Sequence, residues 1–383
     1  MEQFDTDIRN FAFGGAAYGV HPSGKGCFVR GAAPGENVTV EVISEHARFI
    51  RAKLIQINRA APERIVPRCP YADTCPGCSF GHITYEAELF WKQNSFEHFL
   101  LGTGCVEKSV IRHPVPSPER YNWRNKIRLA VENGICGYRG EDNRTLIPVT
   151  SCQLVNAEIN RFLAEMDIPE SGSIELRYTP ANGVVRLDES NCQELIFDTL
   201  PGYGDFPVPA GAFFQTNPQV ASLLADAVVE NIAESGIKEL IELHCGAGVF
   251  SLCAAEKISG LHTGGAEINA SSIETARKAA KMRGLSGRCK FSAGDAAKFY
   301  RKQQNCRLLL VDPPRSGLDG NLMKNIIKNP PEVMIYVSCG PDTLQRDIKK
   351  LAAAGMGVIS AQLFDMFPCT SHFESLTILR REK

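Results

Sequence analysis

The second half of the chain alternates short apolar runs with segments long enough to form helices. Five of the runs read as strands: Glu239–Leu243, His262–Glu267, Cys289–Ser292, Leu308–Val311 and Val333–Val337. Strands that alternate with helices build βαβ units around a parallel sheet. Ligands and chemistry in such sheets lie beyond the carboxyl ends of the strands, so the residues that follow each run are the first candidates for a site.

The first of these strands ends in a turn that contains Gly246 and Gly248 and opens a helix. Glycine lets the backbone approach a ligand closely, and Glu267, at the end of the next strand, can accept hydrogen bonds from a ribose. The third glycine of the dinucleotide fingerprint is missing, which favours S-adenosylmethionine over NAD in a Rossmann-like domain. Asp295, after the third strand, is spaced either to reach the adenine or to begin a helix as its N-cap.

Two later strand ends carry side chains that can react. Asp312 precedes a Pro-Pro pair, which stops the sheet and projects the carboxylate into the cleft. Cys339 follows the fifth strand, where a turn begins. An isolated cysteine is most often a core residue. At the carboxyl end of a parallel strand, on the edge that also carries Asp312, a thiol is placed to attack a substrate.

The chain contains 14 cysteines. Its N-terminus does not read as a signal peptide, and no run approaches the roughly 18 apolar residues of a membrane span, so we expect a cytoplasmic protein with no membrane partner. Reduced thiols are then metal-binding or catalytic rather than disulfide-bonded. Cys69, Cys75 and Cys78 form a metal or cluster signature, with Cys152 as the best fourth ligand. Their spacing fits zinc or iron–sulfur and favours the latter.

We expect three domains. Residues 1–60 alternate short β-like runs with Gly and Pro turns, as in small β-barrels that bind oligonucleotides. Residues 61–205 form a mixed α+β middle domain that carries the four cysteines, and residues 206–383 form the cofactor domain. Within the middle domain, residues 83–101 are predicted to be helical, with Trp91 and Phe99 buried. Arg and Lys concentrate in residues 48–68, which suits contacts with phosphates.

Together these motifs resemble the RNA (uracil-5-)-methyltransferase family along nearly the whole chain. The most specific stretches are Ser-Cys-Gly-Pro-Asp-Thr-Leu-Gln-Arg-Asp around Cys339 and Asp-Met-Phe-Pro-Cys-Thr-Ser-His-Phe-Glu, which ends at Glu374. The resemblance implies a class I methyltransferase domain and an N-terminal TRAM barrel that binds RNA. It also implies that Gln215 contacts the cofactor and that the cysteines hold a 4Fe-4S cluster: Cys69, Cys75, Cys78 and Cys152.

The family's chemistry explains the two motifs. Uracil C5 is a weak nucleophile until a thiolate adds at C6, and a base must later remove the C5 proton. The resemblance implies that Cys339 is that nucleophile, that Glu374 is the base, and that Asp312 holds the uracil edge or the cofactor amine. The family usually has Tyr or Phe at His244, a cofactor-contacting position, and often Asn at Val249, so we expect altered cofactor contacts here. Gly340 replaces the usual Asn after the nucleophile.

The sequence is compatible with either of two RNA substrates. A barrel combined with a cluster resembles the members that form 5-methyluridine in 23S ribosomal RNA, and tRNA is the alternative. A methyltransferase of base amines would leave Cys339 and Glu374 without roles. A catalytically inactive RNA-binding factor is the remaining alternative, which the changes at His244, Val249 and Gly340 favour. We expect a monomer.

Overall fold

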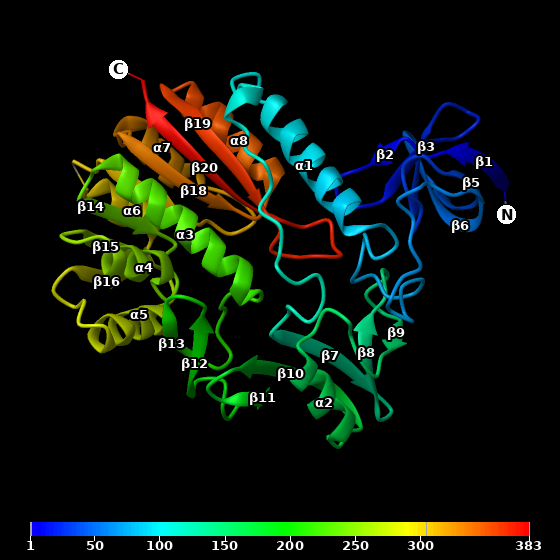
Figure 1. Ribbon diagram of the computed structural model, residues 1–383, viewed down its shortest axis with the longest axis horizontal. Helices are drawn as coiled ribbons and strands as arrows, with labels where there is room; N and C mark the ends of the chain where they lie inside the picture. Colours follow the sequence, from blue (N-terminus) through cyan, green and yellow to red (C-terminus); the bar gives the residue numbers. More distant parts are fainter. Residues whose placement is uncertain (1, 304, 383) are drawn as a thin grey trace.

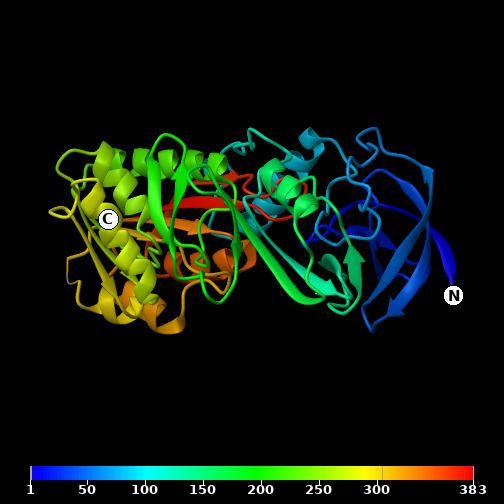
Figure 2. The same cartoon turned by 90° about the horizontal axis from the view of Figure 1, so that it is seen from below.

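The computed structural model describes residues 2–303 and 305–382. Figure 1 shows three sheet-containing bodies arranged around a bend, with the N-terminal sheet at the upper right, a second sheet below and the C-terminal sheet at the left. Seen from below, the second sheet lies between the other two (Figure 2). No helix in the described ranges combines the length and the apolar composition that crossing a bilayer requires.

The N-terminal sheet has six strands in the order β1-β5-β6-β4-β3-β2. Their bounds are β1 Gln3–Asp7, β2 Asn10–Phe11, β3 Ala17–Val20, β4 Gly26–Arg30, β5 Asn37–Glu45 and β6 Phe49–Arg59. Alternate residues of β3, β4 and the first half of β5 are buried, so one face packs a small core that includes Cys27, Val29 and Val38. RNA binding by this sheet stays a prediction.

Helix α1 (Tyr85–Leu101) follows the first three of the predicted metal-binding cysteines and packs against α8 (Pro341–Ala352) of the C-terminal body. Thr84 caps it, because its hydroxyl accepts a hydrogen bond from the backbone of Ala87. Phe96 and Leu100 are buried in the core shared with the C-terminal sheet. Trp91 and Phe99, which the sequence predicts to be buried, are only half-buried, because the face of α1 that meets the C-terminal body is a different one. A short 3-10 helix, Lys108–Val110, follows.

The second sheet has five strands in the order β11-β10-β7-β8-β9, and α2 (Ala157–Glu165) packs against its core. The strands are β7 Lys126–Glu132, β8 Ile135–Arg139, β9 Leu146–Pro148, β10 Ser171–Thr179 and β11 Gly183–Leu187. A hairpin, β12 (Leu195–Leu200) with β13 (Gly204–Pro209), connects this body to the next. The predicted domain boundary between residues 205 and 206 falls inside this hairpin, whose apolar side chains pack in the core of the C-terminal body.

The C-terminal sheet has seven strands in the order β16-β15-β14-β17-β18-β20-β19, and only β20 runs antiparallel to its neighbours. The strands are β14 Glu239–Leu243, β15 His262–Glu267, β16 Cys289–Ala293, β17 Leu308–Val311, β18 Val333–Ser338, β19 Met356–Phe364 and β20 Glu374–Arg381. All five predicted strands are present, and the α/β fold class is confirmed. The order reverses at β14, which has β15 on one side and β17 on the other; such a switch point opens a crevice for ligands.

Helices pack along this sheet (Figure 1). They are α3 Pro218–Ser235, α4 Val249–Lys257, α5 Ala270–Met282, α6 Ala296–Arg301, α7 Gly320–Lys328 and α8 Pro341–Ala352. In the sequence, the Asn217-Pro218 pair predicts a helix start, with Asn as the N-cap and Pro as the first helical residue. The structure confirms it at α3, where the side chain of Asn217 accepts a hydrogen bond from the backbone of Val220.

Candidate active site and a four-cysteine cavity

Three predicted site residues stand at one edge of the C-terminal sheet. Asp312 follows the end of β17 and Cys339 follows the end of the neighbouring parallel strand β18. Glu374 begins β20, which runs the other way, so the start of β20 meets the end of β18. The register of β18 and β20 ends with Ser338 opposite Ser375, so Cys339 and Glu374 are the next residues along the two segments, and the charge of Glu374 acts on the thiol. The sheet thus brings a thiol and two carboxyls to the same crevice.

The thiol of Cys339 is held neutral in this environment. Burial raises its pKa to about 11, and the nearby carboxyls of Glu374 and Asp312 act in the same direction. The guanidinium of Arg315 opposes them. Because only the thiolate attacks, positive charge near Cys339 is needed to ionise it. Arg315 supplies part of that charge, a role that the sequence analysis did not assign to it.

The carboxyl of Glu374 lacks a partner. Its Oε2 is buried and makes no hydrogen bond with any residue in the described ranges. Loss of water and the charge of Asp312 raise its pKa well above the usual value, while Arg315 lowers it. An orphaned carboxylate oxygen is costly in a native structure and marks a place where a substrate group can bind or a proton can move.

Burial also perturbs Asp312 and a further carboxyl on the adjacent strand β14. Burial, and then the charge of Glu267, raise the pKa of Asp312 to about 7. Glu242, within β14, is fully buried; its Oε2 accepts a hydrogen bond from the backbone of Ser251 at 3.0 Å, and burial raises its pKa to about 8. The sequence analysis missed Glu242. An acid in the middle of an apolar strand is the signal that could have found it.

The turn after β14 forms an open backbone cradle. His244, Gly246 and Gly248 all have positive φ angles, of 60°, 51° and 73°. A Cβ at Gly246 would meet nothing within 4 Å, so its backbone faces free space, whereas one at Gly248 would stand 2.6 Å from the ring of Phe291. Nε2 of His244 is buried without a hydrogen-bond partner among the described residues. Bare backbone and an unpaired ring nitrogen suit a polar ligand.

The other predicted cofactor residues surround this turn. Glu267 accepts hydrogen bonds from the backbone N–H groups of Gly246, at 3.3 Å, and Asn269, at 2.9 Å. Asp295 is the N-cap of α6, with its Oδ1 2.8 Å from the backbone nitrogen of Lys298. Gln215 is half-buried just before α3, and its side chain forms no hydrogen bond recorded for the described residues. Binding by these three side chains stays a prediction.

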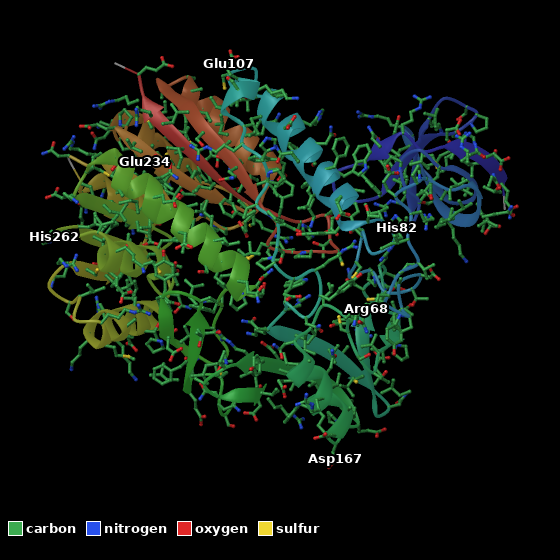
Figure 3. The ribbon with its side chains drawn as sticks, in the orientation of Figure 1. Arg68, His82, Glu107, Asp167, Glu234 and His262 are labelled. Carbon is green, nitrogen blue, oxygen red and sulfur yellow. The ribbon has the colours of Figure 1, made fainter. Side chains whose placement is uncertain are left out.

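A second cavity, of about 320 Å³, lies near the junction of the N-terminal sheet and the second sheet. All four predicted metal ligands line it, together with a fifth thiol: Cys69, Cys75, Cys78, Cys152 and Cys369. Arg68, which also lines it, lies in this junction in Figure 3. Burial raises the pKa of Cys78, and repulsion from the neighbouring thiolates adds to the effect. In the described ranges, however, no three His, Cys, Asp or Glu side chains are grouped tightly enough to hold a metal ion.

Comparisons with known proteins agree with this architecture. Residues 205–382 match the model of the tRNA (uracil-5-)-methyltransferase family. An uncharacterized RNA methyltransferase of Caldanaerobacter subterraneus subsp. tengcongensis is 28% identical, over 99% of this chain and 98% of that protein. One from Aquifex aeolicus is 26% identical, over 97% of each. The crystal structure of Pyrococcus abyssi tRNA (uracil-54, C5)-methyltransferase with S-adenosyl-L-homocysteine is 23% identical, with a TM-score of 0.77, over 98% of this chain and 100% of that one. The fold is therefore shared along nearly the whole chain.

Proposed function

We propose that the chain is an RNA (uracil-5-)-methyltransferase, which the family match of residues 205–382 and the likeness to RNA methyltransferases support. It methylates C5 of a uridine through a covalent bond between Cys339 and C6. S-adenosylmethionine is the proposed methyl donor. The observation that carries the proposal is the pairing at the end of β18, where Cys339 and Glu374 are the next residues along the two segments and the buried Oε2 of Glu374 has no partner in the described ranges. His244, whose buried Nε2 has no hydrogen-bond partner among the described residues, supports a polar ligand at the turn after β14.

Each of these residues has a separate role in the proposed reaction. S-adenosylmethionine would supply an electrophilic methyl group and a positive charge. That charge, with Arg315, favours the ionised forms of Cys339 and Glu374, because an opposite charge nearby lowers the pKa of an acid. The Cys339 thiolate would add to C6, and the electron pair that reaches C5 would take the methyl group from the sulfonium, which would leave as S-adenosylhomocysteine. Glu374 then accepts the C5 proton, the C6–S bond breaks, and the thiolate is restored.

The cofactor side of the proposal predicts a loss of affinity in Glu267→Ala. We propose that Glu267 accepts hydrogen bonds from the ribose hydroxyls. Charge-assisted bonds of this kind contribute roughly 1.5–3 kcal/mol, so the variant should bind S-adenosylmethionine about tenfold to a hundredfold more weakly. Calorimetry measures the change, with the exposed Glu274→Ala on α5 as the control. An unchanged dissociation constant for Glu267→Ala would contradict the assignment.

We propose that the cysteine cavity holds an iron–sulfur cluster rather than a single metal ion. A tetrahedral zinc with Zn–S bonds of about 2.3 Å brings its thiolates within roughly 4 Å of one another. The thiols share a cavity of about 320 Å³ without such a tight group among the described residues. A four-iron cluster is larger than an ion and separates its thiolates more widely. We propose that it is held by Cys69, Cys75, Cys78 and Cys152, where it would stabilise the junction.

Metal analysis tests this assignment. Protein purified without oxygen should be brown and contain about four irons per chain, the content of a 4Fe-4S cluster. Cys152→Ser should lose most of the iron, whereas Cys192→Ser, which changes a cysteine outside the cavity, should keep it. Colourless protein with one zinc per chain would overturn the cluster while keeping the four ligands.

For the substrate, we propose 23S ribosomal RNA, on the combination of a cluster site with a small N-terminal sheet rich in Arg and Lys at its end. Mass-spectrometric mapping of 5-methyluridine in total RNA from cells with and without the gene tests it. Loss of one 5-methyluridine from the ribosomal RNA would support the proposal. Loss from tRNA would move the substrate to the alternative, and no loss from either RNA would favour the inactive RNA-binding factor.

A further inference from the structure

The loop that leads into Glu374 is held by buried charges from a distant part of the chain. This loop, residues 365–373, connects β19 to β20 and lies beside the end of α1 in Figure 1. Lys92, in the middle of α1, is fully buried. Its Nζ is 2.7 Å from Glu88 Oε1 and 2.6 Å from Asp365 Oδ1, and it donates a hydrogen bond to the carbonyl oxygen of Phe367 at 3.1 Å.

Glu88 contacts a second part of the loop, at Cys369. Its Oε1 also accepts a hydrogen bond from the backbone N–H of Cys369, at 2.6 Å. Its Oε2 accepts one from Arg120, at 3.0 Å, and Arg120 also bonds the carbonyl oxygens of Phe80 and Ile83. The side chains of Glu88, Lys92 and Asp365 have no exposed surface at all.

Further hydrogen bonds complete the attachment. Tyr85, on α1, donates to Asp365 Oδ2 at 2.8 Å, and Asn217 donates to the carbonyl oxygen of Met366 at 3.2 Å. The carbonyl oxygen of Cys369 accepts from the backbone N–H groups of the two residues that follow Cys78, at 2.9 and 3.0 Å. Four of the first five loop residues are therefore fixed from outside the loop.

A buried network of this kind is a costly way to gain stability. Taking charges out of water is expensive, and hydrophobic packing would hold a loop as well or better. Fully paired charges instead form directional bonds, which specify a single arrangement of the loop. Here that arrangement sets the path of the chain into His372 and Glu374, and Glu374 itself has no hydrogen bond on Oε2 to any described residue. Glu374 is the first residue after this loop, where its backbone pairs with Phe364 of β19, so the loop and the start of β20 together set the position of its carboxyl.

We propose that Lys92 and Glu88 are positioning residues, which hold the loop so that the carboxyl of Glu374 reaches the C5 proton of the Cys339 adduct. The inference rests on the proposed function. It predicts a specific defect: removal of Lys92 leaves the attack by Cys339 intact and slows the later proton removal. A merely structural role would lower the amount of folded protein without changing which step is slow.

Lys92→Met, made in the full chain, tests the proposal. It keeps much of the side-chain volume and removes the charge. Because a misplacement of about 1 Å can cost on the order of a hundredfold in rate, we expect kcat to fall about that much, with an unchanged KM for S-adenosylmethionine. The covalent enzyme–RNA adduct carrying the labelled methyl group should accumulate on denaturing gels. Glu88→Gln, which keeps a hydrogen-bond acceptor, is the milder variant if Lys92→Met does not fold, and should show a smaller accumulation.

Arg64→Met controls for the loss of a buried ion pair. Arg64 pairs with the fully buried Glu36 beside the N-terminal sheet, with no recorded bond to the loop. The Arg64→Met variant should not accumulate the adduct. If Lys92→Met and Glu88→Gln accumulate no more adduct than Arg64→Met, while Glu374→Gln does accumulate it, the positioning role is overturned. If Glu374→Gln also fails to form an adduct, the proposed function fails instead.

Discussion

A Cys339→Ala variant is expected to lose methyl transfer and to form no covalent complex with RNA. Without the thiolate, C5 of uracil has no means of becoming nucleophilic, so the remaining binding interactions cannot replace the missing step. The loss should be on the order of 10⁴-fold or more, the scale on which removal of an enzymatic nucleophile acts. Transfer of a labelled methyl group to RNA, together with denaturing electrophoresis, measures both effects.

The matched control is Cys105→Ala, which removes an exposed thiol remote from the sheet edge and should leave both readouts unchanged. Binding of S-adenosylmethionine should survive in Cys339→Ala, because the proposed cofactor residues are elsewhere. Methylation that persists in a folded Cys339→Ala protein would contradict covalent catalysis and favour direct transfer to a base amine.

The second large effect is expected in Glu374→Gln, and it distinguishes the role of the base from that of the nucleophile. Glu374→Gln should still attack and still methylate C5, because neither step uses the carboxylate, and should then stall, because a neutral amide cannot take the C5 proton. Turnover should fall by roughly 10²–10⁴-fold, the usual contribution of a general base. Under single-turnover conditions we expect a methyl-labelled enzyme–RNA adduct that survives denaturing electrophoresis.

This outcome differs from that of Cys339→Ala, which should form no adduct. A double variant, with both changes, should therefore behave like Cys339→Ala alone. If folded Glu374→Gln binds both substrates and yields no adduct, the base role moves to His372. That residue is exposed in the same loop, with its backbone nitrogen 3.1 Å from the hydroxyl of Thr370.

Much of the C-terminal body follows from local patterns. Apolar runs bounded by turn residues predicted five strands that the structure contains, and the Asn217-Pro218 pair predicted the start of α3. These features depend on neighbouring residues alone, which is why a single sequence contains them. The same reasoning predicted that Asp312 and Cys339 lie at one edge of the sheet, because the carboxyl ends of adjacent parallel strands meet there.

Other strands left weaker local signals. The hairpin of β12 and β13 and the edge strand β19 were not predicted. Glycine and proline interrupt β13, and β19 contains small and polar residues with a bulge near Ser360. Such strands form because a neighbouring strand or helix covers them, and that cover is supplied only by the folded chain.

The sequence by itself determined the α/β body, the strand ends and the residues able to react there, because each depends on a short stretch of chain. Only the tertiary structure decided how those residues are held. Glu374 meets Cys339 through the antiparallel register of β20. Lys92 lies in a helix full of polar residues and would be taken for a solvated side chain, yet it is fully buried against Asp365, which is 273 positions away. A charge is buried only where partners from elsewhere compensate its lost hydration, and no local pattern records where those partners are.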